Sequence, residues 1–141
     1  MTDLAHQPLL TPFRMGELLL PNRIVMAPLT RQRAANSGHV PTLLQALYYA
    51  QRASAGVIIS EGTAISPEGC GWVDTPGLWS EEQVSGWRVV TDAVHEADGR
   101  IVTQLWHTCA ISHPDLLNGA PPVSASDVNP LQQSVTPAGR C

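Results

Sequence analysis

Three short apolar runs, separated by two capped helical patterns, constrain the fold of this chain more than any other feature. The runs cover residues 24–27, 57–60 and 101–106, and none of them alternates cleanly between apolar and polar side chains. Continuous apolarity predicts strands that are covered on both faces, which is typical of a parallel sheet wrapped by helices. The predicted order of elements is therefore β, α, β, α, β.

Both helices between the strands are predicted to begin with a capping box, in which a Ser or Thr and a residue three positions later satisfy free backbone amides. Thr42 pairs with Gln45 in the first helix, and Ser80 pairs with Gln83 in the second. The first helix stops near Gly56, and the second ends at a left-handed stop. The apolar side of the first helix consists of Leu43, Leu44, Leu47 and Tyr48, and that of the second of Val84, Trp87, Val90 or Thr91, and Val94, before the stop at Asp98-Gly99.

The segments before and after this core have different patterns. Residues 13–15 and 18–20 are apolar and are joined by Gly16 and Glu17, which predicts a β-hairpin within residues 12–22. Residues 113–141 hold five of the twelve prolines and no periodic segment, which predicts a long loop or a disordered tail. The chain is thus expected to be one partial domain, with a hairpin lid in 1–22, β-α-β-α-β in 23–112 and the tail in 113–141.

Three parallel strands with two crossover helices are an incomplete fold. A doubly wound sheet needs helices on both faces, and a barrel needs about eight strands. In a Rossmann fold, a G-x-G-x-x-G turn should follow the first strand, but residues 27–31 contain no glycine. The predicted class is therefore α/β, namely the N-terminal three βα units of a TIM (β/α)8 barrel, preceded by a β-hairpin, with the barrel incomplete.

Charge and composition favour a small-molecule site. The net charge is −4, the pI is about 5.6 and there is no Lys/Arg run, which argues against nucleic acid or an anionic membrane as the main partner. Residues 1–11 have neither a basic start nor an apolar core, and no run of about eighteen apolar residues exists, so we expect no secretory signal, no membrane span and a cytoplasmic location. Cys70, Cys109 and Cys141 are widely spaced and odd in number, which predicts reduced thiols.

In barrel enzymes the working residues gather where the strands end, because the loops there converge on one mouth. After the first strand, Thr30 offers a hydroxyl suited to a ring carbonyl, with a loop or cap role as the alternative. In the third strand, the Gln104 carboxamide must find partners or cost about 1–3 kcal/mol. A carboxamide matches the imide edge of a flavin pyrimidine, and it can equally bond neighbouring backbone.

Five other residues at or after these strand ends have weaker or structural interpretations. Gly62 either permits the close approach of a planar ligand or only makes a turn, and Trp106 either walls a pocket or lies in the core. Glu61 is expected to be a structural carboxylate bonded to loop amides rather than a general base. His107 and His113 are six positions apart, which matches neither helical ligation nor a knuckle, so a metal site is not expected.

Four strings that occur in order resemble the old yellow enzyme family of flavin oxidoreductases, over about residues 9 to 130. They are PFRMG at 12–16 with LPNRIVMAPLTR at 20–31, IISEGTAISP at 58–67, TPGLWS at 75–80, and QLWH at 104–107 with SHPD at 112–115. The resemblance implies an FMN-dependent NADPH dehydrogenase or ene-reductase. Such an enzyme passes hydride from NADPH or NADH through non-covalent FMN to an activated alkene, in ping-pong order.

The resemblance also implies roles for particular residues. The backbone of Ala27, Pro28, Leu29 and Thr30 would support the flavin, and the Thr30 hydroxyl would bond the C4 carbonyl and tune its potential. Gly62 would lie close to the ring, and Gln104 would grip the pyrimidine edge. Trp72, where many relatives carry tyrosine, and Trp106 would shape the substrate pocket. Cys109 departs from the family, whose members commonly have glycine there, so the geometry of that loop is left open.

Two functions follow from these expectations. The chain is either part of an ene-reductase whose remaining units come from a complementing chain or a longer parent, or a truncated, non-catalytic barrel fragment that is inactive or needs a partner. A self-standing binding module is a third alternative, and it predicts cooperative unfolding without flavin. The open edges of the first and third strands favour the second alternative for the isolated chain.

Overall fold

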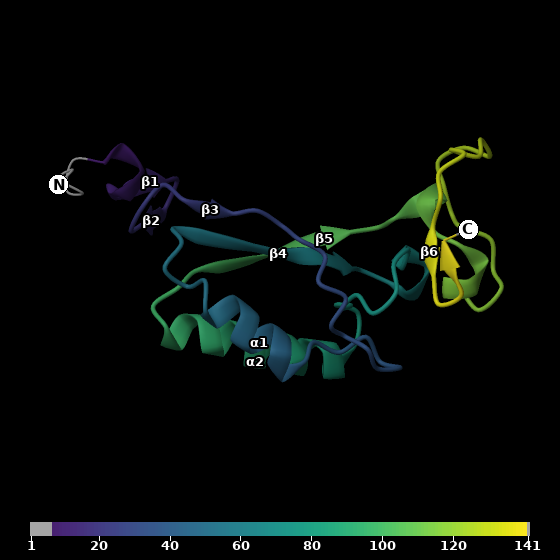
Figure 1. The fold of residues 1–141 in the computed structure, drawn as a ribbon, viewed down its shortest axis with the longest axis horizontal. Helices are drawn as coiled ribbons and strands as arrows, with labels where there is room; N and C mark the ends of the chain where they lie inside the picture. Colours follow the sequence, from purple (N-terminus) through teal and green to yellow (C-terminus); the bar gives the residue numbers. More distant parts are fainter. Residues whose placement is uncertain (1–6, 141) are drawn as a thin grey trace.

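The computed structural model describes residues 7–140, so residues 1–6 and the thiol of Cys141 lie outside the described part. In this part a central sheet lies between two small hairpins, with a pair of helices beside it (Figure 1). The central sheet contains β3 (Val25–Met26), β4 (Val57–Ala64) and β5 (Ile101–Trp106), in the order β3-β4-β5 with all pairs parallel. The helices are α1 (Leu43–Ala50) and α2 (Glu81–Glu96).

The N-terminal hairpin forms where the sequence predicts it. A 3-10 turn (Pro8–Leu10) precedes strands β1 (Phe13–Met15) and β2 (Leu18–Leu20), which pair antiparallel. Gly16 has a φ of +59° in the connecting turn, a backbone conformation that glycine adopts without steric cost. Leu20 is buried, whereas the other strand residues are exposed.

Both predicted capping boxes are present and fix where the helices begin. The Thr42 amide donates to Gln45 Oε1 at 2.8 Å, and the Ser80 amide donates to Gln83 Oε1 at 3.1 Å. At the end of α2, the left-handed residue of the predicted stop is Asp98, with a φ of +57°. The sequence therefore determines both helix starts through local hydrogen bonds.

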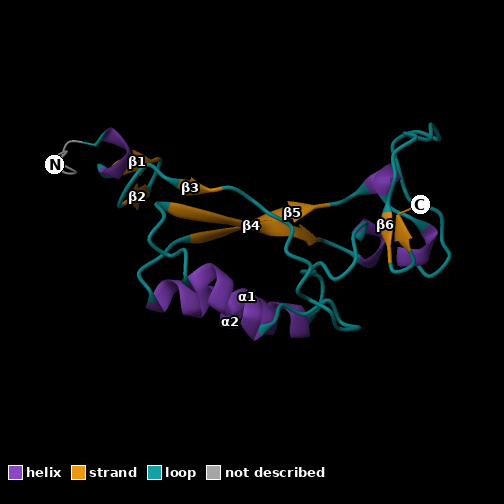
Figure 2. Ribbon diagram, viewed as in Figure 1, coloured by secondary structure: helices purple, strands orange, loops and turns teal. Residues whose placement is uncertain are grey.

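The helices cover one face of the central sheet (Figure 2). The core between them consists of Ala46, Tyr49, Ala53, Ile58, Trp87, Val90 and Val94. The prediction of cover on both faces holds for the central strand β4 and is wrong for its neighbours, since Val25, Val102 and Leu105 are 48%, 44% and 59% exposed. The outer strands have a neighbour along one edge only and helices on one face only.

Helix α1 presents its leucines to solvent. Leu43, Leu44 and Leu47 are 77%, 55% and 56% exposed, whereas the buried residues of the helix are Gln45, Ala46 and Tyr49. The apolar side found in the sequence is therefore not the side that packs on the sheet. The predicted apolar face of α2 does pack there, through Trp87, Val90 and Val94.

Strand β4 contains one more residue than β5 across the same stretch. Ile59 pairs with Val102 and Gly62 with Gln104, so three steps along β4 match two along β5. The Ser60 hydroxyl bridges this bulge, because it accepts from the Gln104 amide at 3.1 Å and donates to the Glu61 carbonyl at 2.8 Å. The bulge reverses the alternation of side chains along the strand.

The predicted tail at residues 113–141 contains a 3-10 turn (Pro114–Leu116) and the antiparallel pair β6 (Val135–Thr136) and β7 (Gly139–Arg140). Residues 117–134 between them hold no helix or strand, in agreement with the predicted long loop. Two further 3-10 turns lie before the tail, at Pro67–Gly69 after β4 and at Cys109–Ile111 after β5. None of the helices within residues 7–140 has the length and apolarity that crossing a membrane requires.

Candidate functional site

The carboxyl ends of β3, β4 and β5 form one edge, because the strands are parallel, and the residues expected at a barrel mouth lie along it. Residues 27–30 follow β3 directly, and Gly62 in β4 pairs with Gln104 in β5. Thr30 and Leu29 are exposed, and Pro28 is half-buried. β3 ends beside Ile58, and the loop that follows it reaches Glu61 through the Arg31 amide, so Thr30 comes to the part of β4 that pairs with Gln104.

A buried carboxylate joins this edge to helix α1. Glu61 is completely buried, and its Oε1 accepts from Gln45 Nε2 at 2.8 Å and from the Tyr49 hydroxyl at 3.3 Å. Its Oε2 accepts from the Arg31 amide at 3.0 Å. The prediction of a structural carboxylate bonded to a loop amide is therefore confirmed.

Tyr49 completes this buried group. Its hydroxyl accepts from the Glu61 amide at 2.8 Å while it donates to the Glu61 side chain. Burial, and then the charge of Glu61, raise the pKa of Tyr49 well above its ordinary value, so its hydroxyl keeps its proton at neutral pH. Sequence reasoning missed Tyr49 and the inward role of Gln45, although a glutamine beside the small residue Ala46 in an otherwise apolar helix is a signal that could have found it.

Two polar side chains of the edge are free of protein partners. Within residues 7–140, neither the Thr30 hydroxyl nor the Gln104 carboxamide forms a hydrogen bond to the chain; only the Gln104 backbone amide does. Bonding of the Gln104 side chain to neighbouring backbone, the structural alternative, is therefore not observed. Both side chains can donate to a ligand, and the carboxamide can also accept.

Gly62 makes room for the indole of Trp106. A Cβ atom on Gly62 would lie 2.5 Å from two ring carbons of Trp106, so no larger residue fits without movement. The planar group beside Gly62 is thus a side chain of this chain. The Trp106 Nε1 is buried and is the buried side-chain polar atom without a hydrogen-bond partner among the described residues. The indole therefore presents an unsatisfied donor close to the edge.

Replacing Gly62 with alanine is expected to displace the Trp106 indole. The new methyl group would overlap the ring, and relief of such overpacking costs about 1–3 kcal/mol. We expect a shift of tryptophan fluorescence toward longer wavelength and a lower urea midpoint. Gly119, whose Cβ would meet no atom within 4 Å but which has a φ of +87°, is a control for backbone effects without a clash. An unchanged emission spectrum for Gly62→Ala would contradict the packing described above.

Trp72 lies apart from these groups. It forms an isolated bridge with Val135 at the C-terminal hairpin, whereas Trp106 pairs with Ala64 inside the central sheet. The structure therefore associates Trp72 with the tail, and Trp106 with Gly62 and Gln104.

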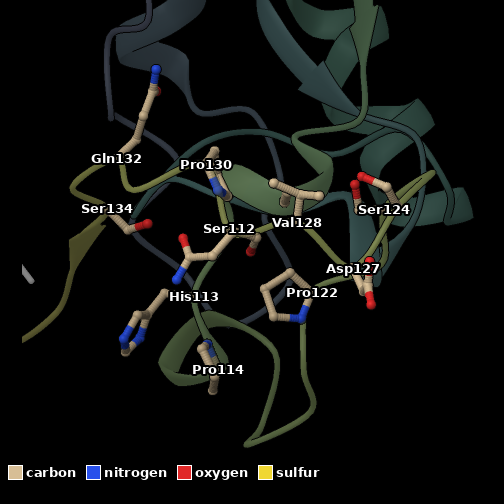
Figure 3. A pocket seen from close by; sticks show the side chains of 13 residues that line it. Ser112, His113, Pro114, Pro122, Ser124, Asp127, Val128, Pro130, Gln132 and Ser134 are labelled. Atoms are coloured by element: carbon tan, nitrogen blue, oxygen red, sulfur yellow. The ribbon is translucent and has the colours of Figure 1, made fainter.

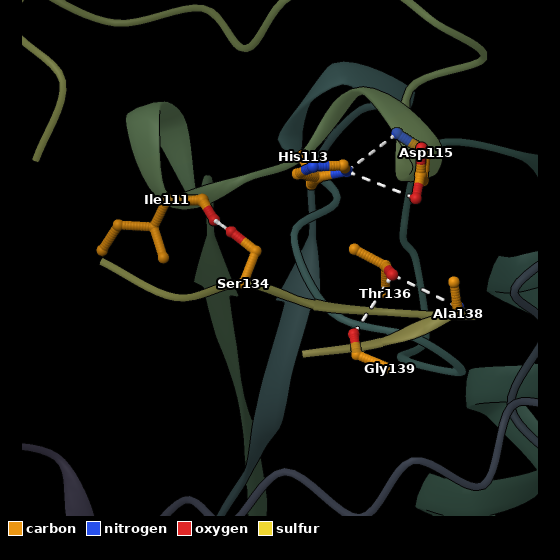
Figure 4. Close-up of polar contacts among 7 residues, drawn as sticks. All are labelled: Ile111, His113, Asp115, Ser134, Thr136, Ala138 and Gly139. Carbon is orange, nitrogen blue, oxygen red and sulfur yellow. Dashed lines mark hydrogen bonds and ion pairs between the residues drawn. The ribbon is translucent and has the colours of Figure 1, made fainter. Parts of the chain in front are cut away.

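A polar hollow of about 430 Å³ lies under the tail, outside the edge of the sheet (Figure 3). Two of the serine hydroxyls that line it are bonded to the chain. Ser134 donates to the Ile111 carbonyl at 2.7 Å (Figure 4). Ser112 donates to the Cys70 carbonyl. His113 accepts from the Asp115 amide at 3.2 Å and lies 3.5 Å from its carboxylate. These groups hold the tail against the loops that follow β4 and β5.

The loop after β5 takes the conformation usual for glycine. Cys109 has a φ of +52°, in the left-handed region that costs other residues about 1–2 kcal/mol. Its amide donates to His107 Nδ1 at 3.1 Å, and its exposed thiol lies 3.3 Å from the same atom. Cys109 therefore has a backbone conformation that glycine would adopt without this cost.

The two described cysteines should react with a thiol reagent at very different rates. Both are free, but Cys70 is buried, and burial raises its pKa to about 11, whereas Cys109 is exposed. At pH 8 the reactive thiolate of Cys70 is scarce. We therefore expect iodoacetamide to label Cys109 at least about tenfold faster, as read by mass spectrometry of peptides. Raising the pH toward 11 should narrow this difference, and equal rates at pH 8 would contradict the burial of Cys70.

The fold and the free polar groups at its edge define a class of protein: a partial α/β barrel with unpaired polar side chains where its strands end. The sequence profile of the NADH:flavin oxidoreductase / NADH oxidase family matches residues 8–140. The chain belongs to this family.

Solved structures and curated relatives agree with this assignment. The old yellow enzyme homologue from Zymomonas mobilis is 47% identical, with a TM-score of 0.90, over 96% of this chain and 38% of that protein. Morphinone reductase in complex with tetrahydroNAD is also 47% identical, with a TM-score of 0.87, over 94% of this chain and 37% of that protein.

Among curated proteins, putative 12-oxophytodienoate reductase 2 of Oryza sativa subsp. japonica is 45% identical over 122 residues, which are 85% of this chain and 32% of the relative. Flavin oxidoreductase hxnT of Emericella nidulans is 43% identical over 126 residues, 86% of this chain and 32% of the relative. The chain thus spans about a third of the length of the curated relatives it matches.

Proposed function

We propose that this chain supplies the N-terminal part of the FMN site of an NAD(P)H-dependent ene-reductase. The observation that carries the proposal is the set of unpaired groups at one edge, with the Thr30 hydroxyl after β3 and the Gln104 carboxamide opposite Gly62. A carboxamide presents a donor and an acceptor side by side, which is the pattern of the flavin pyrimidine edge. The donor set therefore fits FMN.

Each residue has a proposed task toward the flavin. The backbone of Ala27, Pro28, Leu29 and Thr30 supports one face of the ring system, and the Thr30 hydroxyl donates to the C4 carbonyl, where it polarises the ring. Gln104 orients the pyrimidine edge, with Gly62 beside it. When bound, FMN supplies hydride transfer from NADPH or NADH to an activated alkene, such as an α,β-unsaturated carbonyl.

The substrate would meet the aromatic side of the edge. Trp106 is proposed to shape the pocket, because its ring stands against Gly62 and its Nε1 has no protein partner. Trp72 is proposed as a second pocket residue on the resemblance alone. It lies in the loop that follows β4, where it forms a bridge with Val135. Residues 1–22 are proposed as a hairpin lid, and the unpaired thiols favour a cytoplasmic location.

The test is to titrate FMN with the purified chain and follow flavin fluorescence and the visible absorption band. Quenching with a shifted band, lost in a Thr30→Val and Gln104→Leu double variant, would support an FMN site on this chain. Free-flavin spectra at chain concentrations up to the millimolar range would contradict it for the isolated chain. NADPH is then added to ask whether the bound flavin is bleached.

A specific observation favours the alternative, a barrel fragment that is inactive alone and needs a complementing chain. Exposed apolar side chains lie on both outer strands and on α1, namely Val25, Val102, Leu105, Leu43, Leu44 and Leu47. Such surfaces and open strand edges usually have a neighbour. Mixing the chain with the remaining two thirds of the Zymomonas mobilis homologue should then restore flavin binding that neither piece shows alone.

A further inference from the structure

Few contacts hold the loop that carries Thr30 at the edge of the sheet. β3 pairs with β4 only through Val25 and Met26, and within the described chain residues 27–33 form no backbone–backbone hydrogen bond. Two hydrogen bonds join this segment to the fold: the Arg31 amide donates to Glu61 Oε2, and the Thr42 hydroxyl donates to the Arg33 carbonyl. The Arg31 guanidinium also lies over the Tyr48 ring of α1, 4.8 Å from its centroid, but this contact leaves the backbone of residues 27–30 without a partner in the described chain. Of the two hydrogen bonds, only the one to Glu61 of β4 holds the loop backbone next to Thr30.

We propose that Glu61 is a positioning residue that fixes the Thr30–Arg31 peptide at the carboxyl edge of the sheet. The inference rests on the proposed function, because the group so placed is the Thr30 hydroxyl. Glu61 precedes Gly62, so a single strand sets the position of both the loop and the glycine. The carboxylate itself points away from the ligand side, toward α1, where Gln45 and Tyr49 hold it.

The buried surroundings of Glu61 favour a role in positioning the chain, because burying a carboxylate costs free energy unless hydrogen bonds compensate for it. It is fully buried, and no Lys, Arg or His within residues 7–140 forms an ion pair with it. A buried carboxylate is tolerated only when hydrogen bonds replace its hydration. Here three donors do so, from two parts of the fold: Gln45 and Tyr49 of α1, and the Arg31 amide of the loop. The side chain therefore joins the loop, the helix and the strand at a single point.

The substitution Glu61→Gln tests the contact of residue 61 with the loop separately from its contacts with α1. Oε1 has two donors, and Oε2 has only the Arg31 amide. Gln45 cannot turn its amide over freely, since its own Oε1 accepts from the Thr42 amide. Glu61→Gln should therefore keep its carbonyl oxygen toward Gln45 and Tyr49 and place its NH₂ against the Arg31 N–H, so that donor faces donor.

The test is amide hydrogen exchange of the flavin-free chain, measured residue by residue by NMR. We expect Arg31 exchange to become at least about tenfold faster in Glu61→Gln, while the Ile58 amide, bonded to the Arg100 carbonyl, changes less than about twofold. The matched control is Tyr49→Phe, which removes a donor to Oε1 and leaves the Arg31 contact. In that variant Arg31 and Ile58 should change by the same factor.

Two outcomes overturn the proposal: an Arg31 amide that exchanges at the rate of an unstructured peptide in the unaltered chain, or one whose exchange is unaffected by Glu61→Gln. The link to Thr30 has its own readout, a double-mutant cycle on the FMN dissociation constant. Glu61→Gln should weaken binding about as much as Thr30→Val, and the double variant no further; additive effects also overturn the positioning role. If the unaltered chain binds no FMN, the proposed function fails while exchange still decides whether Glu61 holds the loop.

Discussion

Replacing Trp87 with alanine is expected to lower the free energy of unfolding by about 3–5 kcal/mol. The side chain is 5% exposed in the core between the helices and β4, its ring lies 6.4 Å from that of Tyr49, and its Nε1 donates to the Gly77 carbonyl at 3.1 Å. Truncation leaves a cavity and an unpaired carbonyl. Because domains are stable by only about 5–15 kcal/mol, a loss of this size would unfold a substantial fraction of the molecules.

Urea unfolding followed by circular dichroism measures this effect. Val89→Ala is the matched control, because Val89 lies in the same helix but is 46% exposed, so its truncation should cost less than about 0.5 kcal/mol. A Trp87→Ala variant as stable as that control would show that the helices do not pack on β4 as described.

Replacing Gln104 with leucine is expected to raise the FMN dissociation constant about 10- to 100-fold, the equivalent of about 1–3 kcal/mol. Leucine has a similar volume but cannot bond the pyrimidine edge, which then loses both partners that the carboxamide would supply. The strand should be unaffected, since the Gln104 contact inside the protein is made by its backbone amide to Ser60.

The dissociation constant is measured by fluorescence titration of FMN. The titration uses the isolated chain if it binds FMN, and otherwise the chain mixed with the complementing fragment. Thr103→Val is the control, because Thr103 precedes Gln104 in β5 and alternation turns its side chain to the other face. Equal affinities for the Gln104→Leu and Thr103→Val variants would remove Gln104 from the proposed flavin site.

The elements with strong local signals could be predicted from the sequence. The capping boxes at Thr42 and Ser80 and the strand at residues 101–106 agree with the structure. These features depend on hydrogen bonds between near neighbours or on a continuous apolar run, so they need no knowledge of the rest of the fold.

The features that were not predicted depend on contacts between distant residues. β4 ends at Ala64 rather than at residue 60, because Ser60 bridges to Gln104 and lets a polar stretch continue the strand. The leucines of α1 face solvent, because Gln45 and Tyr49 must face Glu61. Neither fact can be read from hydrophobic periodicity, which counts apolar residues and not buried polar partners.

The candidate site was predicted in outline. The sequence indicated which strand ends would meet, and the register of Gly62 with Gln104 brings two of the expected residues together. It did not indicate that the Trp106 indole would fill the space beside Gly62, or that Trp72 would pair with Val135 in the tail. Their roles toward a ligand remain predictions.

The bulge in β4 determines which face of the sheet the following side chains lie on. Ile58 and Glu61 are three positions apart, and strict alternation would send their side chains to opposite sides, yet Ile58 lies in the core and Glu61 bonds α1. If the bulge were straightened at constant length, strict alternation would turn the Glu61 side chain away from α1 to the ligand side, and the loop would lose its acceptor. Ser60, whose hydroxyl bridges the bulge, therefore helps to decide on which face of the sheet the carboxylate lies.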